Sequence, residues 1–208
     1  MKSKVILTMI YDIKLFPPVI SICNILSELN YEIVYIGGCS DMNTEKVLME
    51  RNHVRFYKTP LYGGNGMQRI IQQWKYRRYV LEMLKNEYVK ETTYLWLLHS
   101  ETVSLFSAYL DKYDVISHLF EFKNPTQKIA YRLLNPCYPF EKNLKKSKKV
   151  ICCEYNRAHI TKSIYDLDKV PYILPNKPYN GNVQIAQSLP FSIQEIISKY
   201  RNKKIILY

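Results

Sequence analysis

The sequence predicts an α/β domain with a mostly parallel sheet of about seven strands. Short apolar runs rich in Val, Ile and Tyr alternate with longer stretches of helical periodicity along nearly the whole chain. The composition is globular, because 47% of the 208 residues are hydrophobic, which is enough for a sizeable core. Alternation of this kind places helices on both faces of a parallel sheet, so we expect a Rossmann-like domain of three layers.

The N-terminal elements establish this pattern. Residues 4–10, "KVILTMI", are expected to form a fully buried strand, and "YDIKLFPP" is expected to be a loop. A helix is predicted over 18–30, because its proline suits a first turn and its apolar side chains fall on one stripe. Asn30 ends this helix, since asparagine tolerates the left-handed conformation next best after glycine. Residues 31–38 form the second predicted strand.

The alternation continues toward the C-terminus. We expect further strands at 52–60, 93–100, 113–122, 148–155 and 169–176. We expect further helices at 67–87, 101–113, 126–135 and 156–167. Beyond them come a linker, a last helix at 191–202 and a β-prone run, "KKIILY", at 203–208.

The chain is strongly basic, with a formal net charge of +12. Such a balance favours polyanionic partners: nucleic acid, an anionic membrane surface or phosphorylated substrates. Two clusters carry much of the charge, Lys75–Arg78 and Lys142–Lys149, and the alternative for each is a solvated helix face. Most of the 19 tyrosines lie within apolar runs, and no nucleic-acid-binding motif is present, so nucleic acid is not an expected partner.

The cysteines and the N-terminus indicate the compartment. The five cysteines have no CxxC spacing and their number is odd, which favours a reducing environment. The apolar stretch before Asp12 is too short for a signal peptide, and no run approaches the roughly 20 apolar residues of a membrane span. We expect a cytoplasmic protein that can lie peripherally on the inner face of the membrane.

Polar residues follow several of the predicted strands. In a parallel sheet ligands bind beyond the carboxyl ends of the strands, so these residues are the first candidates for a site. Each also has a structural alternative, because an acid can cap a helix and a histidine inside a strand can belong to the core. The candidates are His99, Glu101, His118, Glu121, Glu154, Asn156, Arg157, Asn176 and Lys177. Because side chains alternate along a strand, His118 and Glu121 are not predicted to form a direct pair.

Other catalytic motifs are missing from the sequence. There is no Walker A motif, no glycine fingerprint for dinucleotides and no His/Cys cluster with zinc spacing. "GGNG" at 63–66 is interpreted as a flexible loop, with a phosphate-binding turn as the alternative. "DLD" at 166–168 resembles a metal-binding motif but precedes a strand, so we interpret it as a turn. Neither a metal nor a cofactor is expected.

The order of these pieces resembles the N-terminal, acceptor-side domain of GT-B fold glycosyltransferases, and is similar to glycosyltransferase family 4 (group 1). The resemblance rests on "PPVISICNILSELNYEIVYIGG" at 17–38 and "YDVISHLFEF" at 113–122. It is closest in "SKKVICCEYNRAHITKSIYDLDKVPYILPNKPY" at 147–179. It covers nearly the whole chain and consists of hydrophobic patterns with a few polar anchors. "KKIILY" resembles the first strand of a second Rossmann-like domain.

The resemblance implies two regions and a function. Residues 1–180 would form the Rossmann-like N-terminal domain, and residues 181–208 the linker, helix and first strand of a missing C-terminal domain. The chain would be the acceptor-binding half of a glycosyltransferase that moves a sugar from a nucleotide-sugar donor to a hydroxyl acceptor, in cell-surface polysaccharide synthesis. The acceptor would be a lipid-linked or other glycan. The donor would bind through the missing domain, so the chain alone is expected to be inactive.

The resemblance also assigns roles to individual residues. It implies catalytic roles for His99 and Glu121 and substrate binding by Phe16 and Pro17. Substrate binding by His118, Glu154, Arg157 and Asn176 is predicted from their places at the strand ends. One departure concerns the first loop, which in the family usually carries glycines whose N–H groups meet phosphate. "YDIKLFPP" has no glycine, and its prolines cannot donate. Either the donor is held otherwise or this loop serves the acceptor alone. The alternative function is a non-catalytic Rossmann-like partner or binding subunit.

Overall fold

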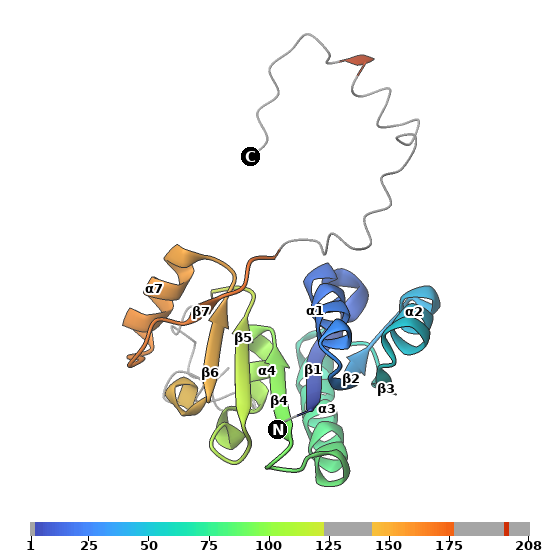
Figure 1. The fold of residues 1–208 in the computed structure, drawn as a ribbon, viewed down its shortest axis with the longest axis horizontal. Helices are drawn as coiled ribbons and strands as arrows, with labels where there is room; N and C mark the ends of the chain where they lie inside the picture. Colours follow the sequence, from blue (N-terminus) through green and yellow to red (C-terminus); the bar gives the residue numbers. More distant parts are fainter. Residues whose placement is uncertain (1–2, 123–142, 177–197, 200–208) are drawn as a thin grey trace. The chain divides into compact units, whose positions relative to one another are not determined.

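The computed structural model describes residues 3–122, 143–176 and 198–199 (Figure 1). The chain divides into two compact units, Met1–Pro178 and Tyr179–Tyr208. The first unit contains the sheet and is described by itself below. The helix predicted at 126–135, the linker and the strand predicted at 203–208 lie outside the described residues, as does nearly all of the helix predicted at 191–202.

Seven parallel strands form one sheet in the order β3-β2-β1-β4-β5-β6-β7. This confirms the predicted fold class, and the order is that of a doubly wound Rossmann-like sheet. The strands are β1 (Lys4–Asp12), β2 (Glu32–Gly38), β3 (Arg55–Lys58), β4 (Thr93–Leu98), β5 (Val115–Leu119), β6 (Lys149–Cys152) and β7 (Tyr172–Ile173).

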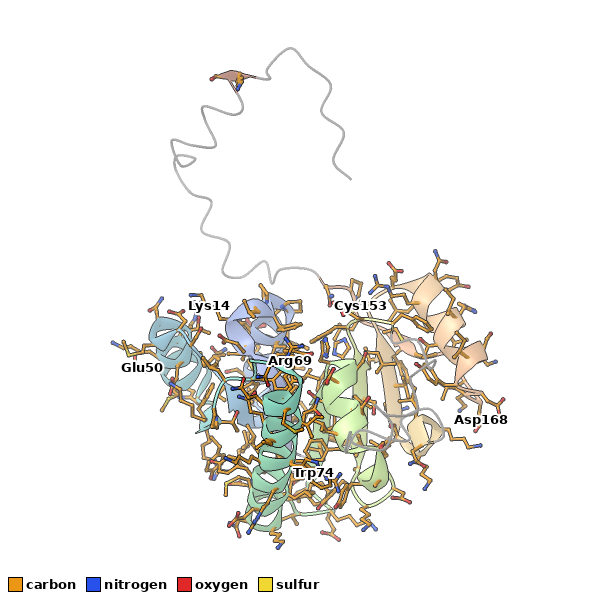
Figure 2. All side chains as sticks on the ribbon, turned by 180° about the vertical axis from the view of Figure 1, so that it is seen from behind. Lys14, Glu50, Arg69, Trp74, Cys153 and Asp168 are labelled. Carbon is orange, nitrogen blue, oxygen red and sulfur yellow. The ribbon has the colours of Figure 1, made fainter. Side chains whose placement is uncertain are left out.

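Helices cover both faces of this sheet (Figures 1 and 2). On one face, α1 (Pro17–Glu28) and α2 (Met42–Asn52) pack on the odd-numbered side chains of β1. On the other face, α3 (Gly66–Glu87) and α4 (Ser100–Leu105) pack on its even-numbered side chains, and α7 (Tyr155–Ile164) joins the same core beside β6 and β7. Short 3-10 helices also occur, η1 (Ile13–Leu15), η2 (Ser107–Tyr109) and η3 (Leu144–Lys146).

The helix ends follow the local sequence. Helix α1 begins with two prolines, and Asn30, just beyond its last turn, has the left-handed φ of 58° that the sequence predicts. Helix α3 begins with a capping box, in which the Asn65 side chain accepts from the Gln68 N–H and the Gln68 side chain accepts from the Asn65 N–H. The "GGNG" segment therefore leads into a capped helix.

Three elements differ from the sequence prediction. Helix α2 was not predicted, because it buries few apolar residues and so has little periodicity; Leu48 is its one buried apolar side chain. Helix α4 ends at Leu105, where we predicted a helix to residue 113, and η2 follows it. Strand β7 has only two residues, far fewer than predicted for 169–176.

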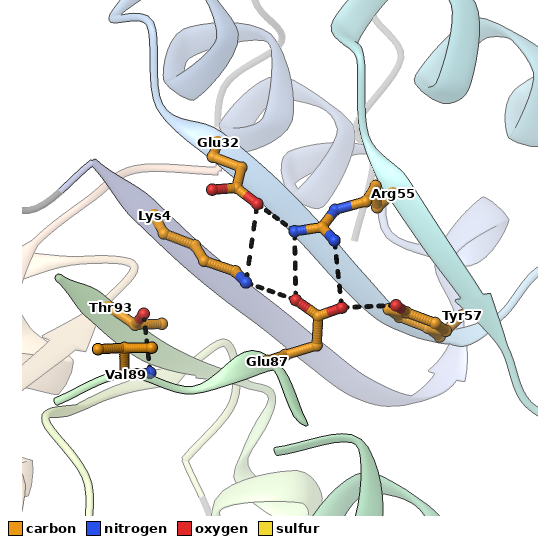
Figure 3. A network of polar contacts seen from close by, with 7 residues as sticks. All are labelled: Lys4, Glu32, Arg55, Tyr57, Glu87, Val89 and Thr93. Carbon is orange, nitrogen blue, oxygen red and sulfur yellow. Dashed lines mark hydrogen bonds and ion pairs between the residues drawn. The ribbon is translucent and has the colours of Figure 1, made fainter. Parts of the chain in front are cut away.

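An ion network lies at the amino edge of the sheet, where β1, β2 and β3 begin and α3 ends (Figure 3). The buried Glu87 carboxylate pairs with the Lys4 ammonium, accepts a hydrogen bond from Arg55 at 3.3 Å and makes a further ion-pair contact with Arg55 at 3.2 Å. Glu32 pairs with Arg55 as well, and the Tyr57 hydroxyl donates to Glu87 at 2.5 Å. Burial alone would raise the pKa of Glu87, but hydrogen bonds from Lys4 and Tyr57 lower it overall.

Candidate functional site

The order of the strands places a switch point between β1 and β4. The strands that follow β1 in the chain extend the sheet to one side, and those that follow β4 extend it to the other. Loops that leave such a point in opposite directions open a crevice beyond the carboxyl ends of the strands. Here β1 continues past β4 as far as Asp12, where it pairs with Gly38 after an irregularity in register.

His99 comes directly after β4, at this switch point. Its backbone has a φ of 76° and a ψ of 140°, which side-chain-bearing residues rarely adopt at a cost of about 1–3 kcal/mol. Its side-chain Nδ1 accepts a hydrogen bond from the Glu101 N–H at 3.2 Å, so the imidazole caps helix α4. When Nδ1 accepts, the neutral ring carries its proton on Nε2. That nitrogen lies 4.0 Å from the exposed Glu121 carboxylate.

Aromatic rings surround His99 on the side of α1. The rings of Tyr11 and Phe16 lie edge-on to the imidazole, with centroids 4.6 and 5.5 Å away. Phe120, which follows β5, stacks on Phe16 at 5.9 Å. These rings form an apolar wall beside a polar centre, the combination that binding pockets commonly use.

Glu101 and three side chains that donate hydrogen bonds to it also lie at the switch point. We call Glu101, Gln73, Tyr11 and Tyr62 the Glu101 group. Glu101 accepts hydrogen bonds from Gln73 at 2.7 Å, from Tyr11 at 3.4 Å and from Tyr62 at 3.5 Å. All three donors are neutral. Burial, and after it the Glu101 charge, raise the pKa of Tyr11, so this phenol remains a hydrogen-bond donor. A cavity of about 370 Å³ adjoins the group and is lined by Ile10, Lys58, Thr59, Pro60, Tyr62, Gln72, Lys75, Tyr76 and Tyr79.

The sequence did not predict the Glu101 group as a site. Glu101 was noted after its strand, but helix capping explained it equally well. Tyr62 comes from the loop after β3, and Gln73 comes from α3. Only the crossing of three chain segments at the switch point brings these side chains together, and no spacing in the sequence indicates that.

Glu154, Arg157 and Asn176 lie at the same edge of the sheet, whereas Lys177 lies outside the described residues. Arg157 donates to the Phe120 carbonyl at 2.9 Å and pairs with Glu154 at 3.1 Å, so it fixes the loops after β5 and β6. Asn176 follows β7 and accepts from the Cys153 thiol at 3.1 Å. Burial raises the pKa of Cys153 to about 11, so this thiol is a weak nucleophile.

Phe16 and Pro17 lie at the entrance to α1, and His118 lies beneath the crevice. Phe16 contributes to the aromatic wall, whereas Pro17 is the exposed first residue of the helix. His118 is buried against Phe120, with ring centroids 4.4 Å apart, and neither of its nitrogens has a hydrogen-bond partner among the described residues. Burial lowers its pKa to about 3, which keeps the ring neutral.

The comparisons with known proteins show the fold alone. No family model and no curated protein matches the chain. A glycosyltransferase from Rickettsia africae matches 96% of this chain and 50% of its own, at 11% identity and a TM-score of 0.57. UGT71G1 of Medicago truncatula, solved with UDP-glucose, matches 96% of this chain and 57% of its own, at 12% identity and a TM-score of 0.55.

A third solved structure is also similar. The N-terminal domain of trehalose-6-phosphate phosphatase from Candida albicans matches 79% of this chain and 43% of its own, at 10% identity and a TM-score of 0.50. The chain thus spans about half the length of each of these structures. The fold is therefore that of a Rossmann-like domain also found in glycosyltransferases. The assignment to family 4 stays a prediction.

Two further searches concern the described residues only. Within residues 3–122, 143–176 and 198–199, no cluster of three or more His, Cys, Asp or Glu side chains could hold a metal ion. Across the same ranges, none of the helices combines the length and the apolar character that crossing a membrane requires.

Proposed function

We propose that this chain is the acceptor-binding half of a glycosyltransferase, which moves a sugar from a nucleotide-sugar donor to a hydroxyl group of a glycan. The observation that carries the proposal is the crevice at the β1/β4 switch point. There, an aromatic wall faces both hydrogen-bond donors and hydrogen-bond acceptors. The fold, which is shared with glycosyltransferases over nearly the whole chain, supports it.

The crevice offers complementary groups for a sugar. The C–H face of a pyranose is apolar and would lie on Tyr11 and Phe16, while its hydroxyl groups would donate to Glu101. The His99 Nε2–H would donate in turn, because the Nδ1 of that ring already accepts from the backbone. Glu154, Arg157 and Asn176, further along the edge, would contact the rest of the acceptor or hold the loops that do.

Glu121 is the proposed base. Its carboxylate is exposed beside His99 and would accept the proton of the attacking hydroxyl as that oxygen bonds to the anomeric carbon and the nucleoside diphosphate leaves. The donor would be held by a second domain outside these 208 residues. Because transfer requires both substrates in attack geometry, the chain alone is expected to show no turnover. Cell-surface polysaccharide synthesis is the proposed role.

Titration of the isotope-labelled chain, followed by NMR, tests acceptor binding. The ligands are free oligosaccharides, a short-chain polyprenyl diphosphate that carries one sugar, and UDP-glucose. We expect the sugar-bearing acceptors to shift the resonances of Tyr11, His99 and Phe120 in a saturable way, and UDP-glucose to shift none. Glu50→Gln, at an exposed carboxylate of α2, is the control.

Two outcomes would contradict the proposal. If no sugar-bearing ligand shifts the crevice resonances while the chain is folded, the chain is a non-catalytic partner. If the 208 residues alone transfer sugar from a nucleotide-sugar, the chain is not half of an enzyme.

A further inference from the structure

Helix α3 carries apolar side chains on the side that faces solvent. Met67, Ile71 and Trp74 are 64%, 48% and 52% exposed. Their spacing of four and then three residues places them on one face of the helix. That face lies opposite the side chains that α3 buries against the sheet, among them Tyr76, Val80 and Leu84. We call the three exposed residues the α3 stripe; Figure 2 shows Trp74 on this helix.

This arrangement is unusual for a helix on the surface of a soluble domain. Such a helix normally has one apolar stripe toward the core and polar residues opposite. In its first half, α3 instead exposes apolar side chains to solvent, while the polar Gln73 lies on the buried side. Next to the stripe, Leu61 is 48% exposed and lines a groove of about 430 Å³ together with Ile71. An exposed apolar patch rimmed by polar residues marks an interaction site.

The charges around the stripe are all positive. No Asp or Glu occurs between residues 59 and 81, and the first turn of α3 has no acid, although the helix dipole favours one there. Arg69, Lys75 and Arg78 are exposed, and neither Lys75 nor Arg78 has an ion-pair partner among the described residues. The Arg77 guanidinium lies 5.3 Å from the Trp74 ring.

The second basic cluster of the chain differs. Lys146 pairs with Asp111 at 3.2 Å, and Lys148 pairs with Asp114 at 2.9 Å. Its positive charge is thus partly neutralised within the fold, and its exposed apolar neighbours, Val170 and Tyr172, do not form a stripe on a helix. Variants of the two clusters therefore compare basic residues beside the α3 stripe with basic residues away from it.

We propose that the α3 stripe binds an anionic lipid bilayer, with Met67, Ile71 and Trp74 in the headgroup region and the surrounding cations on acidic lipids. Basic residues beside exposed Trp and aliphatic side chains are the composition of interfacial helices. Tryptophan prefers the level of the headgroups. A protein partner would match the apolar stripe but would need an acidic rim to match the cations, whereas an anionic bilayer supplies both chemistries.

The groove beside the stripe adjoins the cavity next to the Glu101 group. It shares Tyr62, Gln72 and Lys75 with the cavity that adjoins the Glu101 group. If the chain is the acceptor half of a transferase, as proposed above, a lipid-linked acceptor could reach the crevice from the bilayer along this side of α3. Bilayer binding itself requires neither donor nor acceptor.

Sedimentation with lipid vesicles tests the proposal. The vesicles contain phosphatidylcholine alone or phosphatidylcholine mixed with phosphatidylglycerol. We expect the chain to bind the anionic vesicles only. The double variant Ile71→Ser with Trp74→Ala should weaken this binding about tenfold or more, because each substitution removes apolar surface that would be buried in the bilayer. The matched control is Met42→Ser with Met49→Ser, at exposed methionines of α2, which should bind like the unchanged chain.

Charge variants separate the two basic clusters. Lys75→Gln with Arg78→Gln should weaken binding by about fivefold per charge, the equivalent of roughly 1 kcal/mol near an anionic surface. Lys145→Gln with Lys146→Gln should weaken it far less. In a Trp96→Phe background, the emission of Trp74 should shift to the blue when anionic vesicles are added, which reports insertion directly.

Several outcomes would overturn the proposal. They are equal binding to neutral and anionic vesicles, unchanged binding by the folded stripe variant, or an unshifted Trp74 emission. Dimerisation of the chain in light scattering that Trp74→Ala abolishes would assign the stripe to a second copy instead. His99→Gln should bind vesicles normally, so failure of the transferase proposal and failure of this one are distinguishable.

Discussion

Ionisable groups gather at both edges of the sheet, but they are arranged differently. At the amino edge, the carboxylates of Glu32 and Glu87 face the cations of Lys4 and Arg55. At the carboxyl edge, the donors to Glu101 are neutral side chains, and the Glu121 carboxylate lies 4.0 Å from the His99 imidazole. The amino edge pairs both of these carboxylates with cations. The carboxyl edge pairs Glu154 with Arg157, but there Glu101 and Glu121 lie beside aromatic rings without a Lys or Arg partner among the described residues.

The difference indicates what each edge does. A buried carboxylate that is matched by cations is held in place and has little capacity for a ligand. A carboxylate held by neutral amide and phenol donors keeps its full charge, and it can accept further hydrogen bonds from hydroxyl groups. We therefore expect changes at the amino edge to lower stability and changes at the carboxyl edge to lower binding.

The largest effect on stability is expected at Glu87. Glu87→Ala would leave Lys4 and Arg55 with Glu32 as the one remaining carboxylate of the two that they share, and Lys4 is largely buried. We expect the free energy of unfolding in urea to fall by about 3 kcal/mol, near the lower end for a broken buried ion pair because Arg55 is half-exposed. Glu82→Ala, at an exposed carboxylate of the same helix, should change it by less than about 0.5 kcal/mol.

A stability loss for Glu101→Ala as large as that for Glu87→Ala would contradict the comparison. It would mean that the carboxyl edge, like the amino edge, is a structural network.

Acid should destabilise the fold first through His118. The folded chain keeps this ring neutral, with a pKa near 3, while the unfolded chain binds a proton below its ordinary pKa of 6.5. Stability therefore falls as the pH drops from about 6.5 toward 3, by up to about 1.4 kcal/mol per pH unit. The Glu87 carboxylate has a lowered pKa, so its contribution is lost only at lower pH, as it protonates below its ordinary value of 4.5.

His118→Leu separates these two windows. The variant should remove the loss of stability between pH 6.5 and 4.5 and leave the acid unfolding that Glu87 controls. It also removes two buried nitrogens that lack partners, so it should stabilise the chain at neutral pH by about 1 kcal/mol. Thermal unfolding across a pH series measures both effects. An unchanged pH profile would show that His118 is not the titrating group.

The parallel sheet could be predicted because its strands are buried on both faces and therefore appear as continuous apolar runs, such as β1 and β4. The polar residues at the strand ends could also be found, because each of them follows or interrupts such an apolar run. Helix α2 could not, because burying Leu48 alone among its apolar residues leaves no periodicity. The contacts of Glu101 with Tyr62 and Gln73 could not either, since they depend on how α3 crosses the sheet.

Glu101→Gln should alter binding more than stability. An amide can keep the hydrogen bond from Gln73 at the same position, so the free energy of unfolding should change by less than about 1 kcal/mol. The loss of charge weakens hydrogen bonds from sugar hydroxyl groups, since bonds to an ionised acceptor are roughly twice as strong as neutral ones. We expect the dissociation constant for a glycan acceptor, measured by NMR titration, to rise about tenfold. Unchanged affinity would place the acceptor away from Glu101.

Glu121→Gln should have the smallest effect on the chain by itself. This carboxylate is 73% exposed, and its 4.0 Å contact with His99 is at the limit of an ion pair, so stability should stay within about 0.5 kcal/mol. Acceptor affinity should also change little, because a base acts in the transition state. The effect should appear only when the donor-binding part is present, as a fall in the rate of sugar transfer of about 10²-fold or more. Equal transfer rates for Glu121→Gln and the unchanged protein would exclude Glu121 as the base. Since the neutral His99 ring carries its proton on Nε2, the base would then have to be another carboxylate of this edge, such as Glu101.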